Sequence, residues 1–187
     1  GAHEEKALEN TYPYGMPCVE TKEQLQRLEE QLAEHNILLL FRPHPVQDLS
    51  VFHKEELPHI RIADDVFLAS MECTLYELLA QTDALITDYS SVYFDYLLTD
   101  RPIALTIADR EEYFTRFTLA FPDYKEAVKG FYIETFSQLS SFLAEIAEGV
   151  DSAREERMSA KEKYHTKDAG NSAKAIVDLL EKEYRLK

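Results

Sequence analysis

Residues 84–98 read ALITDYSSVYFDYLL: a short apolar run, a polar turn and a helical pattern in direct succession. The run at 84–87 has the length of a buried strand, and apolar side chains recur at helical spacing over 92–98. Small polar residues at 88–91 join the two segments. A strand, a tight turn and a helix in this order are typical of one unit of an α/β sheet.

The same alternation continues towards the N-terminus. Leucines recur at spacings of three and four over residues 22–35, and Thr21 precedes them as an N-cap residue, so we predict an amphipathic helix there. The continuous apolar run 37–41 suits a parallel strand buried on both faces. That run stops at Arg42-Pro43-His44-Pro45, because proline removes a backbone donor and fixes φ.

The pattern also continues towards the C-terminus. We expect further strands at 60–62, 103–107 and 131–133, and further helices at 74–81, 137–148 (capped by Ser137), 151–164 and 171–184. This order predicts an α/β fold with a Rossmann-like, doubly wound parallel sheet. We expect residues 1–20 to be a tag scar and lead-in segment, and 21–187 to form one domain.

Composition narrows the classes of function. The chain has 187 residues, a hydrophobic content of 45% and a formal net charge of −15. This acidity argues against a general binder of nucleic acid or of anionic membranes, since both attract cationic surfaces. Cys18 and Cys73 form neither a disulfide framework nor a metal set, so we expect free thiols in a reducing, cytoplasmic setting. No run approaches the length of a membrane span, and no signal-peptide core is visible.

The turn at 87–91 is the first candidate site. In open α/β sheets, ligands bind beyond the carboxyl ends of the strands. A helix start offers unpaired N–H groups, and the hydroxyls of Ser90 and Ser91 can add donors for a phosphate. Thr87 and Asp88 belong to the same turn, where Asp88 would orient the loop. The alternative is a simple helix cap by Asp88 or Ser90 with no ligand.

The segment Arg42-Pro43-His44-Pro45 is the second candidate. His44 follows a strand on a loop stiffened by prolines, and its near-neutral pKa suits proton transfer or a hydrogen bond to a phosphate. Arg42 can pair with a phosphate or with one of the many acids. The alternative for His44 is a surface histidine in a turn.

Other polar clusters have plainer interpretations. Residues 168–172 read as a turn and an N-cap, and the charge run 154–157 reads as a solvated helix face. The remaining histidines have no metal-ligand spacing, so no metal site is expected. Glycine-rich phosphate loops and the common hydrolase motifs are absent from the sequence.

Taken together, these segments resemble a known family. The run 77–96, ELLAQTDALITDYSSVYFDY, followed by Arg101-Pro102-Ile103, is similar to the signature of the CDP-glycerol glycerophosphotransferases, which are teichoic-acid polymerases and primases. The His-Pro pair at 44–45 lies at the expected distance before it. The segment 168–173 is similar to the closing motif of that family. The resemblance covers about residues 25–182.

The resemblance implies a two-domain GT-B fold, of which this chain would be the C-terminal, nucleotide-binding half. It implies that His44 acts in transfer near the diphosphate, that Ser90 and Ser91 bind phosphate, and that Asp168 and Gly170 edge the nucleotide site. The substrate would be CDP-glycerol or another CDP-alcohol, without a further cofactor.

The resemblance also implies partners and a place of action. The acceptor would be a lipid-linked polymer, reached through an N-terminal half that this chain lacks. The full-length protein would be peripheral at the inner membrane face. Because the family supplies a second catalytic histidine from that half, the isolated chain is expected to bind its donor but to turn over poorly.

The chain departs from the family pattern beyond Asp109, where 114–129 is an aromatic, partly charged insert, and at Ala169, where the family has a second aspartate. The donor alcohol is therefore open between glycerol, ribitol and a sugar. Two other functions stay open at this point. One is half of a GT-B glycosyltransferase or epimerase using a UDP-sugar, and the other is a non-catalytic module that retains the fold.

Overall fold

The computed structural model describes residues 12–43, 52, 56–110, 121, 123–165 and 170–184. The elements in chain order are α1 (Lys22–Glu34), β1 (Leu39–Phe41), β2 (Ile60–Ile62), α2 (Asp65–Ser70), α3 (Leu75–Leu79), β3 (Leu85–Thr87), α4 (Val92–Tyr96), the 3₁₀ helix η2 (Leu97–Thr99), β4 (Ile103–Thr106), α6 (Tyr124–Ala127), β5 (Phe131–Ile133), α7 (Phe136–Glu148), α8 (Arg154–Tyr164) and α9 (Ser172–Tyr184). Every predicted strand is present, and α2 is a helix that the periodicity did not indicate.

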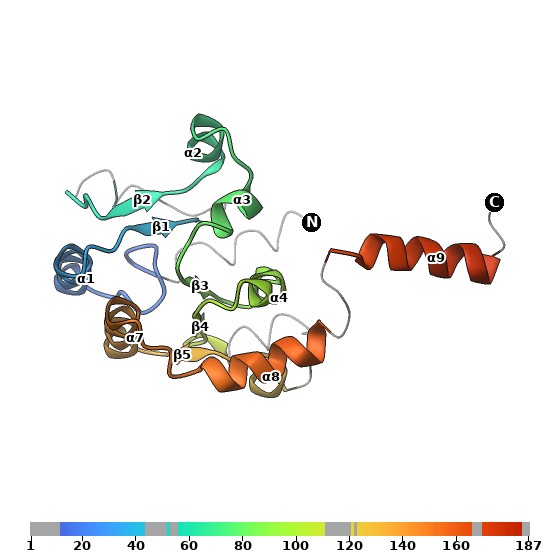
Figure 1. Ribbon diagram of the computed structural model, residues 1–187. Coiled ribbons are helices and arrows are strands. Elements are labelled where there is room, and N and C mark those ends of the chain that lie inside the picture. The colour runs from blue at the N-terminus through green and yellow to red at the C-terminus, as the bar shows by residue number, and fades with distance from the viewer. Residues whose placement is uncertain are drawn as a thin grey trace, which may run out of the picture.

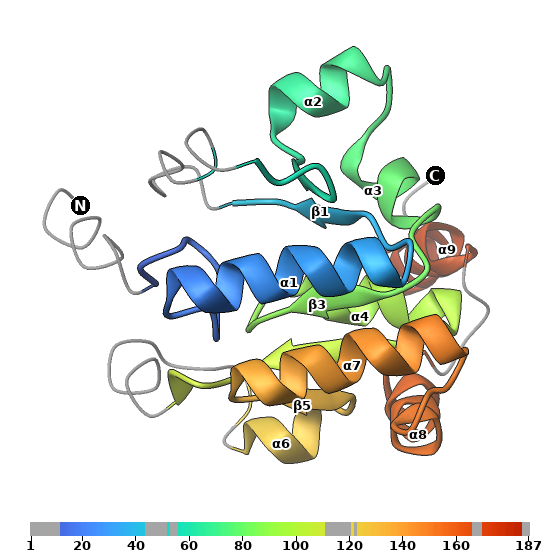
Figure 2. The same ribbon diagram turned by 90° about the vertical axis from the view of Figure 1, so that its left-hand side faces the viewer.

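The strands are parallel within each hydrogen-bonded sheet. β1 pairs with β2, and β3, β4 and β5 form a second sheet in that order. The two sheets lie side by side, with β1 next to β3, so that the strands follow the spatial order β2-β1-β3-β4-β5 (Figure 1). Their carboxyl ends lie on the same side of the molecule, at the left in Figure 2. This confirms the predicted Rossmann-like parallel architecture.

Helices cover both faces of the strands, as a doubly wound fold requires. On one face, α1 and α7 lie side by side and share a core with Ala104 and Ile133. On the other face, Ile103 and Leu105 pack with α4, α6 and α8. Alternate residues of β4 therefore serve opposite cores, and all four of its residues are buried. β4 is the central strand of this sheet.

Capping residues fix the ends of the long helices. Thr21 caps α1 in a capping box with Gln24, as predicted. The expected cap of α7 is wrong: Thr135 takes that place, because its hydroxyl accepts a hydrogen bond from the Gln138 N–H, and Ser137 lies inside the first turn. Gly149 ends α7 with a φ of +67°, a left-handed conformation that favours glycine.

The described part of the lead-in segment packs onto the domain. Met16, Cys18 and Val19 are buried in the core that contains α1 and α7. Burial raises the pKa of the Cys18 thiol to about 11, so that it stays protonated at neutral pH. Cys18 and Cys73 are free cysteines, as expected.

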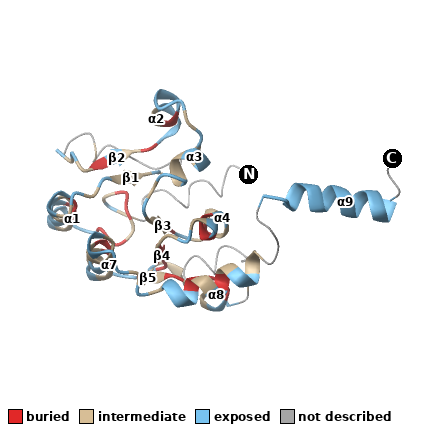
Figure 3. Cartoon of the chain, viewed as in Figure 1, coloured by how far each residue is buried: buried red, intermediate tan, exposed pale blue. Residues whose placement is uncertain are grey.

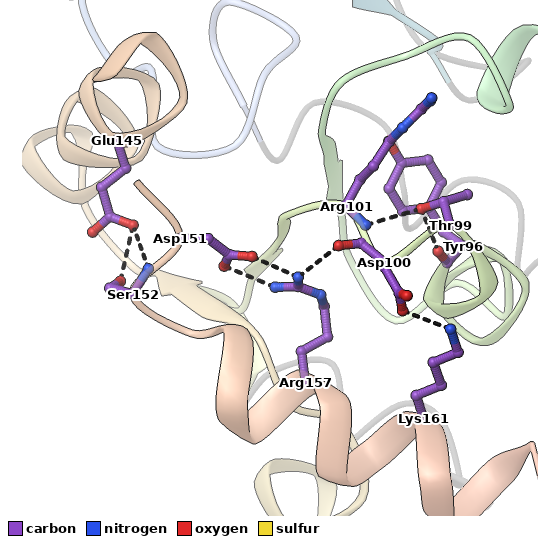
Figure 4. A network of polar contacts seen from close by, with 9 residues as sticks. All are labelled: Tyr96, Thr99, Asp100, Arg101, Glu145, Asp151, Ser152, Arg157 and Lys161. Atoms are coloured by element: carbon purple, nitrogen blue, oxygen red, sulfur yellow. Dashed lines mark hydrogen bonds and ion pairs between the residues drawn. The ribbon is translucent and has the colours of Figure 1, made fainter. Parts of the chain in front are cut away.

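The charge run on α8 is not a solvated face throughout. Arg157 is only 1% exposed and donates hydrogen bonds to the Asp151 carboxylate and to the Asp100 carbonyl oxygen (Figure 4). Lys161 pairs with the Asp100 carboxylate at 2.6 Å. This network fastens α8 to the turn between η2 and β4. The sequence prediction failed for Arg157 because one of its two partners, Asp100, lies 57 positions away in the chain.

The last helix, α9, differs from all the others. It projects away from the sheet (Figure 1), and none of its residues is buried (Figure 3). Its apolar side chains are exposed, including Ile176 at 58% and Leu179 at 56%. Among the described residues, no helix combines the length and the apolar character needed to cross a membrane.

Candidate functional site

The candidate site lies at the carboxyl edge of the strands. From β1 the chain moves to β2 on one side, whereas β3 and the later strands lie on the other side (Figure 2). The order of strands therefore reverses between β1 and β3, and such a switch point is where open α/β sheets bind ligands. Arg42 follows β1 directly, and Asp88 follows β3 directly. The fold thus brings the two predicted segments to one edge.

The turn after β3 is ordered by its own polar groups. Thr87 ends β3 and is buried, and its carbonyl oxygen accepts a hydrogen bond from the Thr106 hydroxyl at 3.3 Å. The exposed carboxylate of Asp88 accepts a hydrogen bond from the Ser90 N–H at 3.1 Å. This is an Asx turn, in which the side chain of Asp88 shapes the backbone that follows it.

The two serines present their hydroxyls at the start of α4. Ser90 is exposed, and its Oγ accepts a long hydrogen bond of 3.4 Å from the Val92 N–H. Ser91 occupies the N-cap position, but its side chain makes no capping hydrogen bond. Both residues named in the cap-only alternative, Asp88 and Ser90, thus accept hydrogen bonds from backbone N–H groups of this turn. The Ser91 hydroxyl is exposed at the sheet edge.

Arg42 is engaged with the protein itself. Its Nη1 donates to the Ala63 carbonyl oxygen at 2.9 Å, and its Nη2 donates to the Asp65 carboxylate at 2.8 Å. The guanidinium thus joins the end of β1 to the turn between β2 and α2. In this arrangement Arg42 braces the loop beside the switch point, and a phosphate would have to share it with Asp65.

Two predicted residues lie outside the described part of the chain: His44, which follows Pro43, and Asp168, which precedes α9. Gly170 is described and has a φ of +97°, a conformation that favours glycine over other residues. An added Cβ at Gly170 would meet no atom within 4 Å, so the backbone conformation alone accounts for a glycine there.

The sequence analysis missed a group of tyrosines around Asp109. The Tyr89 hydroxyl donates to the Asp109 carboxylate at 2.9 Å, and the same carboxylate contributes to the raised pKa of Tyr12. The Tyr124 hydroxyl donates to the Asp88 carbonyl oxygen at 2.9 Å. The rings of Tyr89 and Tyr124 meet edge to face, with centroids 5.1 Å apart. We call these four side chains, together with the Asp88 carbonyl, the tyrosine clamp.

Burial and the Asp109 charge both act on the clamp. Burial is the larger cause that raises the pKa of Tyr89 above its ordinary value, and the hydrogen bond to Asp109 adds to it. The pKa of Tyr12 is raised for the same reasons. Both phenols therefore stay protonated over the physiological range, and Tyr89 donates to Asp109. The position of Asp109, just beyond a predicted strand, was the sequence signal that could have pointed to this group.

Two histidines, His59 and His165, link elements that are far apart in the sequence. His59 lies with its Nδ1 2.6 Å from the Glu29 carboxylate, and joins β2 to α1. His165 makes a 2.8 Å hydrogen bond between its Nε2 and the Phe94 carbonyl oxygen, at the end of α8. In the described ranges, no three His, Cys, Asp or Glu side chains gather as metal ligands.

The described edge can bind an anion through neutral donors. It offers two serine hydroxyls and backbone N–H groups at the start of a helix, where the peptide dipoles favour negative charge. It also exposes the Asp88 carboxylate, which would face away from a phosphate or bind hydroxyl groups of a ligand. Such a set of groups can position a phosphorylated substrate but offers no described nucleophile.

Comparison with known proteins identifies the type of domain. The sequence profile described as CDP-Glycerol:Poly(glycerophosphate) glycerophosphotransferase matches residues 14–182. The teichoic acid ribitol-phosphate primase of Bacillus spizizenii is 26% identical over 160 residues, which are 83% of this chain and 37% of that protein. The teichoic acid glycerol-phosphate primase of the same organism is 37% identical over 89 residues, which are 46% of this chain and 21% of that protein.

Solved structures share the fold. The wall teichoic acid polymerase TagF superposes with a TM-score of 0.58 at 22% identity, over 89% of this chain and 39% of the polymerase chain. This chain therefore spans about two fifths, or less, of the length of these relatives. The matched residues include the switch point and the turn that follows β3.

Proposed function

This chain belongs to the CDP-glycerol:poly(glycerophosphate) glycerophosphotransferase family, and from that premise we propose that it is the donor-binding domain of a teichoic-acid-type phosphotransferase. The family consists of transferases of teichoic acid synthesis. The finer proposal is that this domain holds a CDP-alcohol, with CDP-glycerol as the first candidate. It rests on one observation: a serine-bearing turn lies at the switch point of the parallel strands, within the residues that match the family.

Relatives support the proposal by their own names. Two primases that match this chain are described as acting with glycerol phosphate and with ribitol phosphate. A variant of TagF was solved after a soak with CDPG, and it superposes on this chain with a TM-score of 0.58 at 24% identity. The choice between a glycerol and a ribitol donor is therefore the first question for this chain.

The proposed reaction is a phosphoryl transfer. A hydroxyl oxygen of the acceptor attacks the β-phosphorus of the CDP-alcohol, and a new P–O bond forms. The bond from that phosphorus to the oxygen bridging the α- and β-phosphates breaks, so CMP leaves with the bonding electrons. The acceptor hydroxyl loses its proton. Positioning and charge stabilisation supply most of the catalysis in such reactions.

We assign the roles as follows. Ser90, Ser91 and the backbone after Thr87 bind the phosphates, while Asp88 shapes the turn through its hydrogen bond to the Ser90 N–H. Arg42 braces the facing loop through Asp65. In this proposal His44 stands beside the diphosphate as a proton acceptor or a hydrogen-bond donor.

The remaining assignments come from the family alone. Asp168 and Gly170 are assigned to the edge of the nucleotide site, and a lipid-linked polymer is assigned as the acceptor. The full-length protein is placed at the inner face of the membrane, with the acceptor held by a further domain. In this proposal the present domain binds the donor but does not complete transfer by itself.

A calorimetric titration tests the proposal. The domain is titrated with CDP-glycerol, CDP, UDP and UDP-N-acetylglucosamine. We expect selectivity for cytidine nucleotides, and a loss of affinity of about tenfold or more in His44→Ala and Ser91→Ala, since hydrogen bonds to charged groups are worth about 1.5–3 kcal/mol. His35→Ala, at the end of α1, and Ser141→Ala, on α7, are the matched controls.

The result of this titration distinguishes the proposed function from its two alternatives. Cytidine-selective binding that both site variants weaken supports the proposal. Selectivity for uridine nucleotides replaces it with the UDP-sugar alternative. A folded domain that binds none of the four ligands contradicts the assignment of donor binding to this domain, and favours a module that retains only the fold.

A further inference from the structure

The tyrosine clamp contacts the turn that we propose to bind phosphate, and its side chains are not among the groups that we assign to the phosphate. Asp109 lies beyond β4, Tyr124 begins α6, and Tyr12 precedes α1. Three separate segments of chain thus converge on the turn after β3. Convergence from distant segments is how a protein holds a loop in one conformation when its own local bonds are few.

The contacts reach two neighbouring residues of the Asx turn. Tyr124 holds the backbone at Asp88 through its 2.9 Å hydrogen bond to the carbonyl oxygen. Tyr89 is itself part of the turn, and its hydroxyl is fixed by Asp109 at 2.9 Å. The Asp88 carbonyl and the Tyr89 side chain are therefore both held from outside the turn. The hydrogen bonds from the N–H groups of Ser90 and Val92 add local support.

The clamp also deals with the charge of Asp109. A carboxylate near a bound diphosphate would repel it. Asp109 accepts a hydrogen bond from the Tyr89 phenol, which orients one of its carboxylate oxygens towards the protein. Asp109 thereby fixes the side chain of Tyr89. Tyr124, which is 6% exposed, adds a buried ring against Tyr89.

We propose that Asp109 and Tyr124 are positioning residues, which hold the turn at 88–91 in the shape that receives the β-phosphate of the donor. Asp109 acts through Tyr89, and Tyr124 acts through the Asp88 carbonyl. This inference rests on the proposed function, because it specifies how the phosphate subsite is kept in place. Neither residue touches the substrate.

The test uses three variants that remove single bonds: Asp109→Asn, Tyr89→Phe and Tyr124→Phe. Tyr96→Phe is the matched control, because its hydroxyl also donates to a backbone carbonyl, that of Thr82 at 3.0 Å, but at the other end of α4. Two quantities are measured in each protein. The first is amide hydrogen exchange at Ser90 and Val92 without ligand, and the second is the ratio of the affinities for CDP and CMP.

We expect faster exchange at both amides in the three variants than in the Tyr96→Phe control. We also expect the affinity for CDP to fall by about tenfold, while the affinity for CMP falls less. The ratio matters because a general loss of stability would lower both affinities alike. Far-UV circular dichroism shows which variants are folded, and Tyr89→Phe and Tyr124→Phe change only one oxygen each.

The outcomes separate the two proposals. Exchange and affinity ratios equal to those of Tyr96→Phe would overturn the positioning role, even if the unaltered domain binds CDP tightly. A domain that binds no cytidine nucleotide, but whose turn exchanges faster in the variants, would keep the clamp as a holder of the turn while overturning its link to phosphate and the proposed function.

Discussion

The guanidinium of Arg157 forms a two-pronged ion pair with the carboxylate of Asp151, with Nη1–Oδ1 at 2.8 Å and Nη2–Oδ2 at 2.5 Å (Figure 4). The arginine is almost fully buried, so its charge depends on this partner and on the Asp100 carbonyl oxygen. The pair joins α8 to the segment that precedes it, and the hydrogen bond to Asp100 joins α8 to the turn before β4. The ion pair is therefore structural, whereas the sequence of α8 alone predicted that Arg157 lies on a solvated face.

Breaking this pair on one side is expected to be costly. Asp151→Asn leaves a buried guanidinium without its counter-charge, so we expect the free energy of unfolding in urea to fall by about 3–5 kcal/mol. Lys161→Met is the control, because Lys161 pairs with Asp100 at a more exposed position and such pairs contribute about 0–1 kcal/mol. Equal losses in the two variants would contradict this account of Arg157.

Gly130 is expected to tolerate no side chain. A Cβ at this position would lie 2.6 Å from the Ile103 carbonyl oxygen, which belongs to the backbone of β4 and has little room to move. We expect Gly130→Ala to lower the free energy of unfolding by about 1–3 kcal/mol through overpacking. Urea denaturation of both proteins measures this change in the free energy of unfolding.

Gly149→Ala is the matched comparison for that prediction. Its φ of +67° is strained for alanine, but an added Cβ meets nothing within 4 Å. Its cost should therefore be about 1 kcal/mol, the cost of a left-handed non-glycine residue. A larger loss at Gly149 than at Gly130 would show that the close approach to β4 is not what requires a glycine.

Stability is expected to decline at alkaline pH. Burial is the main cause that raises the pKa of Tyr93 from 10.0 to about 12. An unfolded tyrosine loses its proton near pH 10, whereas folded Tyr93 keeps it until about pH 12. The folded state binds more protons in that interval, so the free energy of unfolding should be steady below pH 10 and fall between pH 10 and 12.

Substitution of Tyr93 isolates its share of that decline. Tyr93→Phe removes the titrating group, so its stability should fall less steeply between pH 10 and 12. It should also be less stable at neutral pH, because the hydroxyl bonds both the Lys129 carbonyl and the Lys129 N–H. Tyr184→Phe, on exposed α9, should leave the slope unchanged. An unaltered slope in Tyr93→Phe would refute the assignment.

Removal of α9 is expected to leave the domain folded. None of its residues is buried, so a chain that ends at Asn171, directly before α9, loses no core contact of this helix. We expect thermal unfolding of that chain to match the full chain, with a change in stability within about 0.5 kcal/mol. A chain that also lacks α8 should be much less stable, because Arg157 and Ala160 are buried. Marked destabilisation on removal of α9 alone would contradict its isolated placement.

Local signals predicted most of the fold. Apolar runs of strand length located all five strands, and the Thr21–Gln24 capping box located the start of α1. These features depend on residues close together in the chain. The helix α2 was missed, although its N-cap Asp64 is a local signal.

Features that depend on distant partners could not be predicted. Arg157 is buried because Asp100, 57 positions away, supplies a carbonyl oxygen. Arg42 was expected to pair with a phosphate or with an acid, and the fold supplies an acid, Asp65, at 2.8 Å. The pair of Tyr89 and Asp109 exists only because β3 and β4 are neighbours. A single sequence carries no direct signal for such contacts.

The candidate site also has features that the sequence predicted and features that only the structure shows. The turn at 87–91 and its place after a strand were readable from the sequence, because strand, turn and helix are local. That the turn lies at the switch point, and that Tyr124 and Asp109 hold it, required the spatial order of the strands.

A crystal structure of the domain soaked with CDP-glycerol tests the central claim most directly. The account predicts electron density for a diphosphate within hydrogen-bond distance of Ser90 or Ser91, at the carboxyl edge between β1 and β3. Density for the ligand at another place on the domain, with the turn at 88–91 free of it, would contradict the account.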